Sequence, residues 1–169
     1  MIRRTTLHAL RCRCSRGFTL AEVIVVIVIM GIAALVVVPQ VLDAGTVSIQ
    51  AAARLIVSDL LYAQNEAVAA QASFKVAFDP TNNRYQVTDG NDQVLTNEQI
   101  GGPYLIDFSS DDRIKNVTLA TTDFNGQTVI TFDEMGSPSA GGTIELTSGS
   151  RHYRITVAPF TGRVTVESL

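Results

Sequence analysis

Glu22 is the first residue in this sequence whose chemistry stands out, because it is a lone acid at the start of an apolar stretch. A glycine and an aromatic residue open residues 17–40, and residues 23–38 carry no formal charge. A carboxylate inside a lipid bilayer costs a few kcal/mol, so it usually marks a function or a partner. The simpler alternative is that Glu22 reaches the headgroups near the cytoplasmic face.

Catalytic chemistry is not indicated elsewhere in the chain. His152 is the single histidine after residue 17, and both cysteines, Cys12 and Cys14, precede that residue. The strings G-x-S-x-G and H-E-x-x-H and a phosphate loop do not occur in the sequence. We therefore expect neither enzyme activity nor a cofactor, and no disulfide in an exported part.

Two groups of residues invite a binding hypothesis, and the first is acidic. Carboxylate and amide oxygens suit calcium, but neither acidic turn has the spacing of a known calcium loop. We expect solvated turns and no metal at these residues: Asp89, Asn91, Asp92, Asp111 and Asp112.

The second group is basic, and its candidate DNA contacts are Arg151, Arg154 and Arg163. Side chains alternate along a strand, so Arg151 and Arg154 fall on opposite faces and the patch is split. After residue 17 the chain keeps 13 − 5 = 8 basic residues against 16 acidic ones, a net charge near −8. Such an acidic domain disfavours nonspecific binding to phosphates, so DNA is not an expected partner.

The apolar stretch itself predicts a membrane helix. About 20 apolar residues cross roughly 30 Å of hydrocarbon, and a helix satisfies its own backbone there. Five arginines and no acid precede it, so the positive-inside rule keeps the N-terminus cytoplasmic and sends the rest across. A secretory signal peptide is cut after its apolar core, whereas the Gly17–Phe18 bond precedes this one.

The string Gly17-Phe18-Thr19-Leu20-Ala21-Glu22 before an apolar helix resembles the type IV prepilin signature. The resemblance implies a prepilin peptidase/methyltransferase that cuts after Gly17 and methylates the new N-terminus, Phe18. It also implies that Glu22 serves filament assembly. The amine of Phe18 on one subunit would neutralise Glu22 on a neighbour and set the axial stagger. Gly31 and Pro39 are the expected kink sites, since proline lacks an amide hydrogen.

After the span of residues 18–39 we expect an amphipathic continuation of the helix over residues 40–72. Apolar residues, mostly alanine, recur there at helical spacing, which predicts close packing on a sheet. Arg54, Asp59, Gln64 and Glu66 are expected mostly on other faces. A separate helix joined by an elbow at Gly45 is the alternative.

Residues 73–169 change to the alternating pattern of strands separated by turn-forming groups. An antiparallel sheet or small sandwich is predicted, which makes the fold class α+β. The expected strands are residues 74–78, 84–87, 93–95, 104–108, 114–120, 128–132, 143–146, 153–157 and 163–166.

The C-terminal half is similar to the GspH/FimT group of minor pseudopilins, on strings such as Ile130-Thr131-Phe132-Asp133 and Tyr153-Arg154-Ile155-Thr156-Val157. The resemblance implies a type II secretion pseudopilin in the inner membrane, with the basic leader (residues 1–17) cytoplasmic and the β-rich domain periplasmic. Its partners would be other pseudopilins or pilins, membrane lipid and a secreted substrate. The alternatives are a minor pilin of a type IV or DNA-uptake pilus, and a membrane-tethered binding domain that does not polymerise.

Overall fold

The computed structural model describes residues 18–42, 44–97 and 101–169, with the side chains of residues 34–45 outside that description. The chain divides into two compact units, Met1–Val41 and Leu42–Leu169.

All of helix α1 (Leu20–Leu42) except its last residue belongs to the first unit. It runs through both Gly31 and Pro39. Among the described residues, no helix is both long enough and apolar enough to cross a membrane. The predicted span continues over residues 34–38, whose side chains lie outside the description. Membrane insertion therefore stays a prediction.

Helix α2 (Ala44–Ala70) opens the second unit. Residue 43 lies outside the described residues, so the predicted helical continuity across residues 40–72 stays a prediction. Gln71, in the left-handed region at φ 50°, ends α2, and the amide of Ala72 donates to the carbonyl of Ala67 (3.2 Å). The buried stripe of α2 consists of Ile49, Ala52, Ala53, Ile56, Leu60, Ala63 and Ala67.

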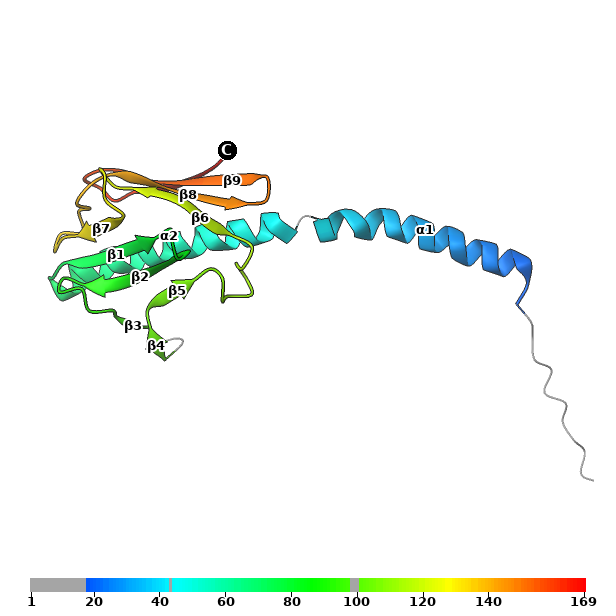
Figure 1. Cartoon of the computed structure of the whole chain (residues 1–169), viewed down its shortest axis with the longest axis horizontal. Coiled ribbons are helices and arrows are strands. Elements are labelled where there is room, and N and C mark those ends of the chain that lie inside the picture. Colours follow the sequence, from blue (N-terminus) through cyan, green and yellow to red (C-terminus); the bar gives the residue numbers. More distant parts are fainter. Residues whose placement is uncertain (1–17, 43, 98–100) are drawn as a thin grey trace, which may run out of the picture. The chain divides into compact units, whose positions relative to one another are not determined.

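Two four-stranded antiparallel sheets follow (Figure 1). The first has the order β5-β2-β1-β7, with β1 (Phe74–Asp79), β2 (Arg84–Asp89), β5 (Leu105–Asp107) and β7 (Val129–Phe132). The second has the order β10-β9-β8-β6, with β6 (Thr118–Asp123), β8 (Gly142–Ser148), β9 (Arg151–Val157) and β10 (Val164–Ser168). A small pair joins β3 (Thr96–Asn97) to β4 (Gly102–Pro103).

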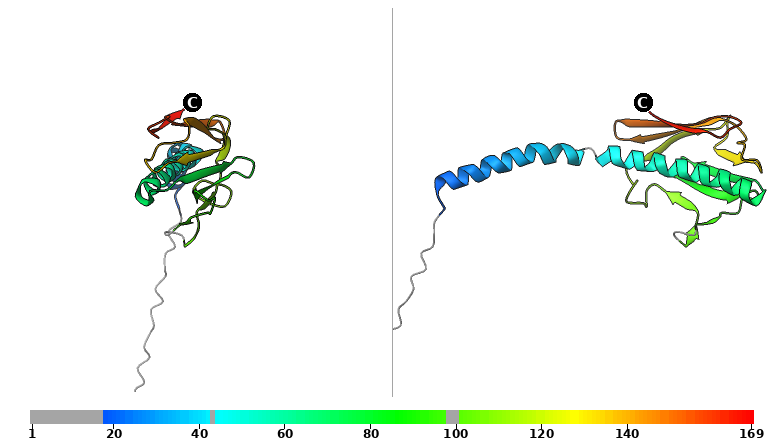
Figure 2. Two further views of the ribbon diagram at one scale, coloured as in Figure 1. Left: turned by 90° about the vertical axis from the view of Figure 1, so that its left-hand side faces the viewer. Right: turned by 180° about the vertical axis from the view of Figure 1, so that it is seen from behind.

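Helix α2 runs alongside both sheets, as the reverse view shows (Figure 2). It contacts β1 and β7 of the first sheet and β8 and β9 of the second. The ring of Phe78 on β1 packs against Phe124, which follows β6, at a centroid distance of 5.9 Å. One continuous core therefore joins the helix and both sheets. These observations confirm an α+β fold with antiparallel sheets.

The structure differs from the predicted strands in three places, one of which is the pair of β3 and β4, where no strand was expected. The strand expected over residues 114–120 begins only at Thr118 and reaches Asp123. Ile114 and Val117 lie in hydrogen-bonded turns and are buried there. These two apolar residues therefore belong to the core without being part of a strand. The weak strand expected over residues 93–95 is an isolated bridge between Thr88 and Val94.

Candidate functional site

The N-terminal motif forms the start of α1. Thr19 Oγ1 accepts a hydrogen bond from the amide of Glu22 (3.2 Å), and the amide of Val23 donates to the carbonyl of Thr19 (3.2 Å). Thr19 is thus the N-cap, and Glu22 is the third residue of the helix, three positions after the cap. Phe18 precedes the cap and is 81% exposed. Gly17, the other residue of the predicted cleavage bond, lies outside the described residues.

Within the first unit, no other described residue covers the apolar surface around this motif. Large apolar side chains on successive positions of α1 are exposed, from Leu20 to Ile32. A helix that is apolar on all sides needs burial in lipid or in a protein interior. A neighbouring subunit or a membrane would supply such burial.

The two expected kink sites lie within α1 without ending it. A Cβ added to Gly31 would meet nothing within 4 Å, so no packing contact requires glycine there. Pro39 belongs to the helix, which continues to Leu42. Kinking at either residue stays a prediction.

The candidate DNA contacts lie on or beside the second sheet. Arg154 Nη2 on β9 pairs with Glu145 Oε1 on β8 at 2.7 Å, and its register partner on β10 is Glu167. The Arg154 guanidinium beside it lowers the pKa of the Glu145 carboxyl. Arg151 lies at the exposed start of β9, and Arg163 precedes β10. The three arginines therefore do not form one uncompensated cationic face.

The carboxylates considered for calcium stabilise their own turns. Asp89 Oδ1 accepts from the amides of Asn91 (2.8 Å) and Gln93 (2.9 Å), and Asp92 pairs with Lys75 at 2.6 Å. Asp111 pairs with Arg113 and Asp112 with Lys115. Across residues 18–42, 44–97 and 101–169, no three His, Cys, Asp or Glu side chains lie close enough to hold a metal ion.

Asp59 corrects a prediction, since it was expected on another face of the helix but is only 3% exposed. Tyr85 Oη donates to its Oδ2 at 2.6 Å, and Tyr104 Oη donates to its Oδ1 at 2.9 Å. Burial raises the pKa of the Asp59 carboxyl above its ordinary value, against these hydrogen bonds, which lower it. Burial and the nearby carboxylate raise the pKa of both tyrosines, which therefore remain donors.

A signal for this cluster is present in the helical spacing. Position 59 lies three residues after Ile56, four before Ala63 and seven after Ala52, and all three of these are buried. Because aspartate is polar, the sequence pattern did not indicate that residue 59 belongs to the buried stripe. A buried carboxylate is tolerated when donors satisfy it, and the two tyrosines are distant in sequence.

The N-terminal segment and α+β domain define a class, that of prepilin-type subunits. Residues 12–38 match the model of the prokaryotic N-terminal methylation motif, which implies processing by a prepilin peptidase. Residues 52–162, about two thirds of the chain, match the model of type II transport protein GspH. The chain therefore belongs to the GspH family. It is a minor pilin-like subunit of the type II secretion or type IV pilus kind.

Two solved structures show a partial similarity to this chain. The minor pseudopilin EpsH of the Vibrio cholerae Type 2 Secretion System is 13% identical at a TM-score of 0.49, covering 72% of this chain and 97% of that one. The type IV minor pilin FimU of Pseudomonas aeruginosa is 19% identical at a TM-score of 0.47, covering 70% of this chain and 91% of that one. No curated protein sequence matches the chain significantly.

Proposed function

We propose that this chain is a minor pseudopilin of a type II secretion pseudopilus and supports protein export. The observation that carries the proposal is the pairing, on one chain, of a methylation motif over residues 12–38 with a GspH match over residues 52–162. A prepilin peptidase cuts the Gly17–Phe18 bond and methylates Phe18. Other pseudopilins are the assembly partners, and the secreted protein is a further contact.

The mechanism begins in the inner membrane, where the apolar helix from Phe18 to about Val38 anchors the subunit with its β-rich domain in the periplasm. The exposed apolar side chains of α1 support this step, because lipid and neighbouring helices both cover such a surface. Glu22 then pairs with the Phe18 amine of an adjacent subunit. That amine exists only after cleavage, so processing is coupled to assembly.

Crosslinking from the N-terminus tests the proposal in native membranes. A photoreactive residue at Leu20, which is 78% exposed, lies two residues from the proposed terminus. Mass spectrometry identifies the crosslinked proteins and the N-terminal peptide. Crosslinks to secretion pseudopilins and a peptide that begins at methylated Phe18 are expected.

Two other outcomes assign the chain differently. Crosslinks to a major pilin instead would place the subunit in a type IV or DNA-uptake pilus. An intact leader without any pilin-like partner would leave a membrane-tethered binding domain that does not polymerise. Either result would overturn the secretion assignment.

A further inference from the structure

Strand β10 is an outer strand of the second sheet, where it pairs with β9 alone. At one end of this pairing the amide of Leu169 donates to the carbonyl of His152 (2.9 Å). At the other end the amide of Ala158 donates to the carbonyl of Arg163 (2.8 Å). Residues of an antiparallel strand bond alternately to one neighbour and to the other, so the odd-numbered residues of this strand bond to β9.

The even-numbered residues therefore direct their backbone groups to the open side of the sheet. Each offers one amide and one carbonyl there, in the spacing of an antiparallel partner strand. These residues are Val164, Val166 and Ser168.

The other outer strands of the two sheets are less open than β10. Strand β5 has only three residues, and the pairing of β6 with β8 is interrupted by a bulge. On the outer side of β7 the amide of Ser139 donates to the carbonyl of Thr131 (2.7 Å). Strand β10 has five residues without proline, lysine or a bulge, and its charged side chain, Glu167, lies on the face opposite Val166. An edge that lacks such protection can accept a further strand.

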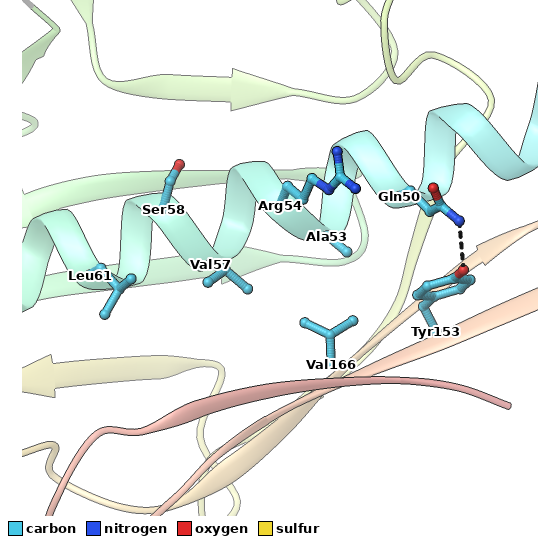
Figure 3. Close-up of a pocket in the computed structure, with 8 residues that line it drawn as sticks. All are labelled: Gln50, Ala53, Arg54, Val57, Ser58, Leu61, Tyr153 and Val166. Carbon is cyan, nitrogen blue, oxygen red and sulfur yellow. Dashed lines mark hydrogen bonds between the residues drawn. The ribbon is translucent and has the colours of Figure 1, made fainter.

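Beside this edge the unit carries an open apolar groove of about 460 Å³ between α2 and strands β9 and β10. In Figure 3, Val57 and Leu61 point from the helix toward Val166 on β10. The backbone of Val166 is thus open at the edge while its side chain helps to form the groove. Directly opposite residues of paired strands place their side chains on the same face. A residue opposite Val166 in an added strand would therefore direct its side chain to the groove.

Charge beside the groove describes the added strand further. Arg54 is exposed at the groove and forms no ion pair or hydrogen bond within the described part of the chain. It lies one helical turn after Gln50, whose Nε2 donates to Tyr153 Oη (3.2 Å). Tyr153 is in turn the register partner of Ser168. An acid opposite Ser168 would therefore lie toward the uncompensated charge of Arg54.

We propose that β10 and the groove bind an extended strand of a different protein, which joins the second sheet antiparallel to β10. Backbone hydrogen bonds to β10 hold this strand, alternate apolar side chains enter the groove, and an acid on the same face pairs with Arg54. The chain is a minor subunit, so the strand comes from a different protein and not from a second copy. The docking surface belongs to the second unit, so the inference goes beyond the proposed function and does not depend on cleavage at the N-terminus.

Binding of a designed peptide to the full-length chain in a mild detergent tests the docking. The probe is a fluorescein-labelled peptide, Thr-Glu-Thr-Val-Thr-Val-Thr, whose glutamate and valines share one face of an extended strand. Antiparallel to β10, these three residues lie opposite Ser168, Val166 and Val164. We expect saturable binding in a fluorescence anisotropy titration. A probe without saturable binding would overturn the proposal.

Methylation of single peptide amides supplies a matched control. Methylating the amide of the valine opposite Val166 removes a hydrogen bond to β10, so it should weaken binding by about tenfold or more. The amide of the central threonine faces away from β10, and its methylation should change the affinity by less than about threefold. Equal affinities of the two methylated peptides would contradict strand addition, because side chains alone would then account for the binding.

Val166→Pro tests the same hydrogen bonds from the side of the chain. Its ring removes an outward amide and leaves the pairing with β9 intact, since proline is tolerated at such edge positions. The affinity should fall about tenfold with little change in melting temperature. Val166→Thr keeps the amide and the branched side chain, so it should bind within about threefold of the parent. Unchanged binding by Val166→Pro would overturn the proposal.

Arg54→Glu tests the charge at the groove. It should weaken binding of the peptide about tenfold, and a peptide with lysine in place of glutamate should restore the affinity. A failure of the lysine peptide to restore binding would contradict the pairing with Arg54.

The oligomeric state of the chain without peptide distinguishes the proposed partner from a second copy. A dimer that Val166→Pro abolishes would overturn the proposal, because a second copy would then occupy the edge. The proposed function would still stand, since its own test is cleavage and crosslinking at the N-terminus.

Discussion

At the scale of single residues, Glu22 combines a local and a collective role. Its backbone amide donates to Oγ1 of the N-cap Thr19, which stabilises the start of α1 within one chain. Its charge, however, has no partner in the apolar stretch that follows. The two roles depend on different atoms, so substitution can separate them.

Glu22→Gln should insert and be processed normally but fail to assemble. Glutamine retains the backbone amide that donates to Thr19, and it lacks the charge that pairs with a neighbour's N-terminal amine. Breaking a buried pair costs about 3–5 kcal/mol, so incorporation into filaments should fall by about a hundredfold or more. Immunoblots of sheared filaments and of membranes measure this ratio. Glu22→Ala should behave alike, and normal incorporation of both variants would refute the charge mechanism.

Asp59 makes a second residue-scale prediction, which concerns pH. The folded pKa of Asp59 is raised above its ordinary value of 3.8, so between these two values the unfolded chain has lost a proton that the folded chain retains. The unfolding free energy of the parent therefore falls as pH rises through this window. Asp59→Asn lacks the titration, so the stability of the parent relative to the variant should decline with rising pH and then level off.

Urea unfolding from about pH 4 to about pH 8 measures this difference. Asp112→Asn is the control, because its carboxylate is exposed and pairs only with Lys115. A parent that gains stability relative to Asp59→Asn as pH rises would show that the pKa is lowered instead.

At the scale of elements, α2 packs on both sheets and makes side-chain hydrogen bonds to other elements from two of its faces. Its alanine-rich stripe lets it pack closely on both, and Asp59 joins it to Tyr85 on β2 and to Tyr104 ahead of β5. On another side Gln64 connects it to the turns that follow β7 and β9. The helix thus determines where these two turns lie.

Gln64→Ala should destabilise the domain by about 2 kcal/mol, because two hydrogen bonds are lost at about 1 kcal/mol each. Gln71→Ala is the matched control, since that glutamine follows α2, bonds only to the carbonyl of Val68 one turn earlier and should change stability by less than about 0.5 kcal/mol. Chemical denaturation measures both. Equal changes in stability would show that the hydrogen bonds of Gln64 contribute no more than those of an ordinary surface glutamine.

At the scale of the whole molecule, the leader and the rest of the chain carry net charges of opposite sign. Residues 1–17 hold five basic residues and no acid, whereas the remainder is strongly acidic. Arg154 is further compensated by Glu145. Long-range repulsion should therefore keep the domain away from polyanions.

Duplex DNA should accordingly bind weakly, with a dissociation constant of about 10⁻⁴ M or weaker at physiological salt. Replacing Arg151, Arg154 and Arg163 by alanine should leave that value unchanged in a fluorescence anisotropy titration. Tight binding that the triple variant weakens, with a shallower salt dependence, would instead favour a DNA-uptake pilus.

The sequence by itself determined the features that depend on neighbouring residues. The Gly17–Phe18 signature is a contiguous string, and the methylation-motif match over residues 12–38 agrees with it. The hairpin of β1 and β2 followed from alternation and from a turn over residues 79–83, so its register needed no distant contact. Helical spacing likewise predicted the alanine stripe.

Only the tertiary structure decided what depends on residues far apart in the chain. Asp59 is tolerated in the core because Tyr85 and Tyr104, from other elements, donate hydrogen bonds to it. Gln64 joins two turns that are distant in sequence, because both lie beside it in the folded chain. The neighbours β1 and β7, and β6 and β8, are not consecutive, so no local pattern encodes their pairing. The exposure of Met135 and Phe160 arises in the same way, because exposure is a property of the packed chain and no residue type specifies it.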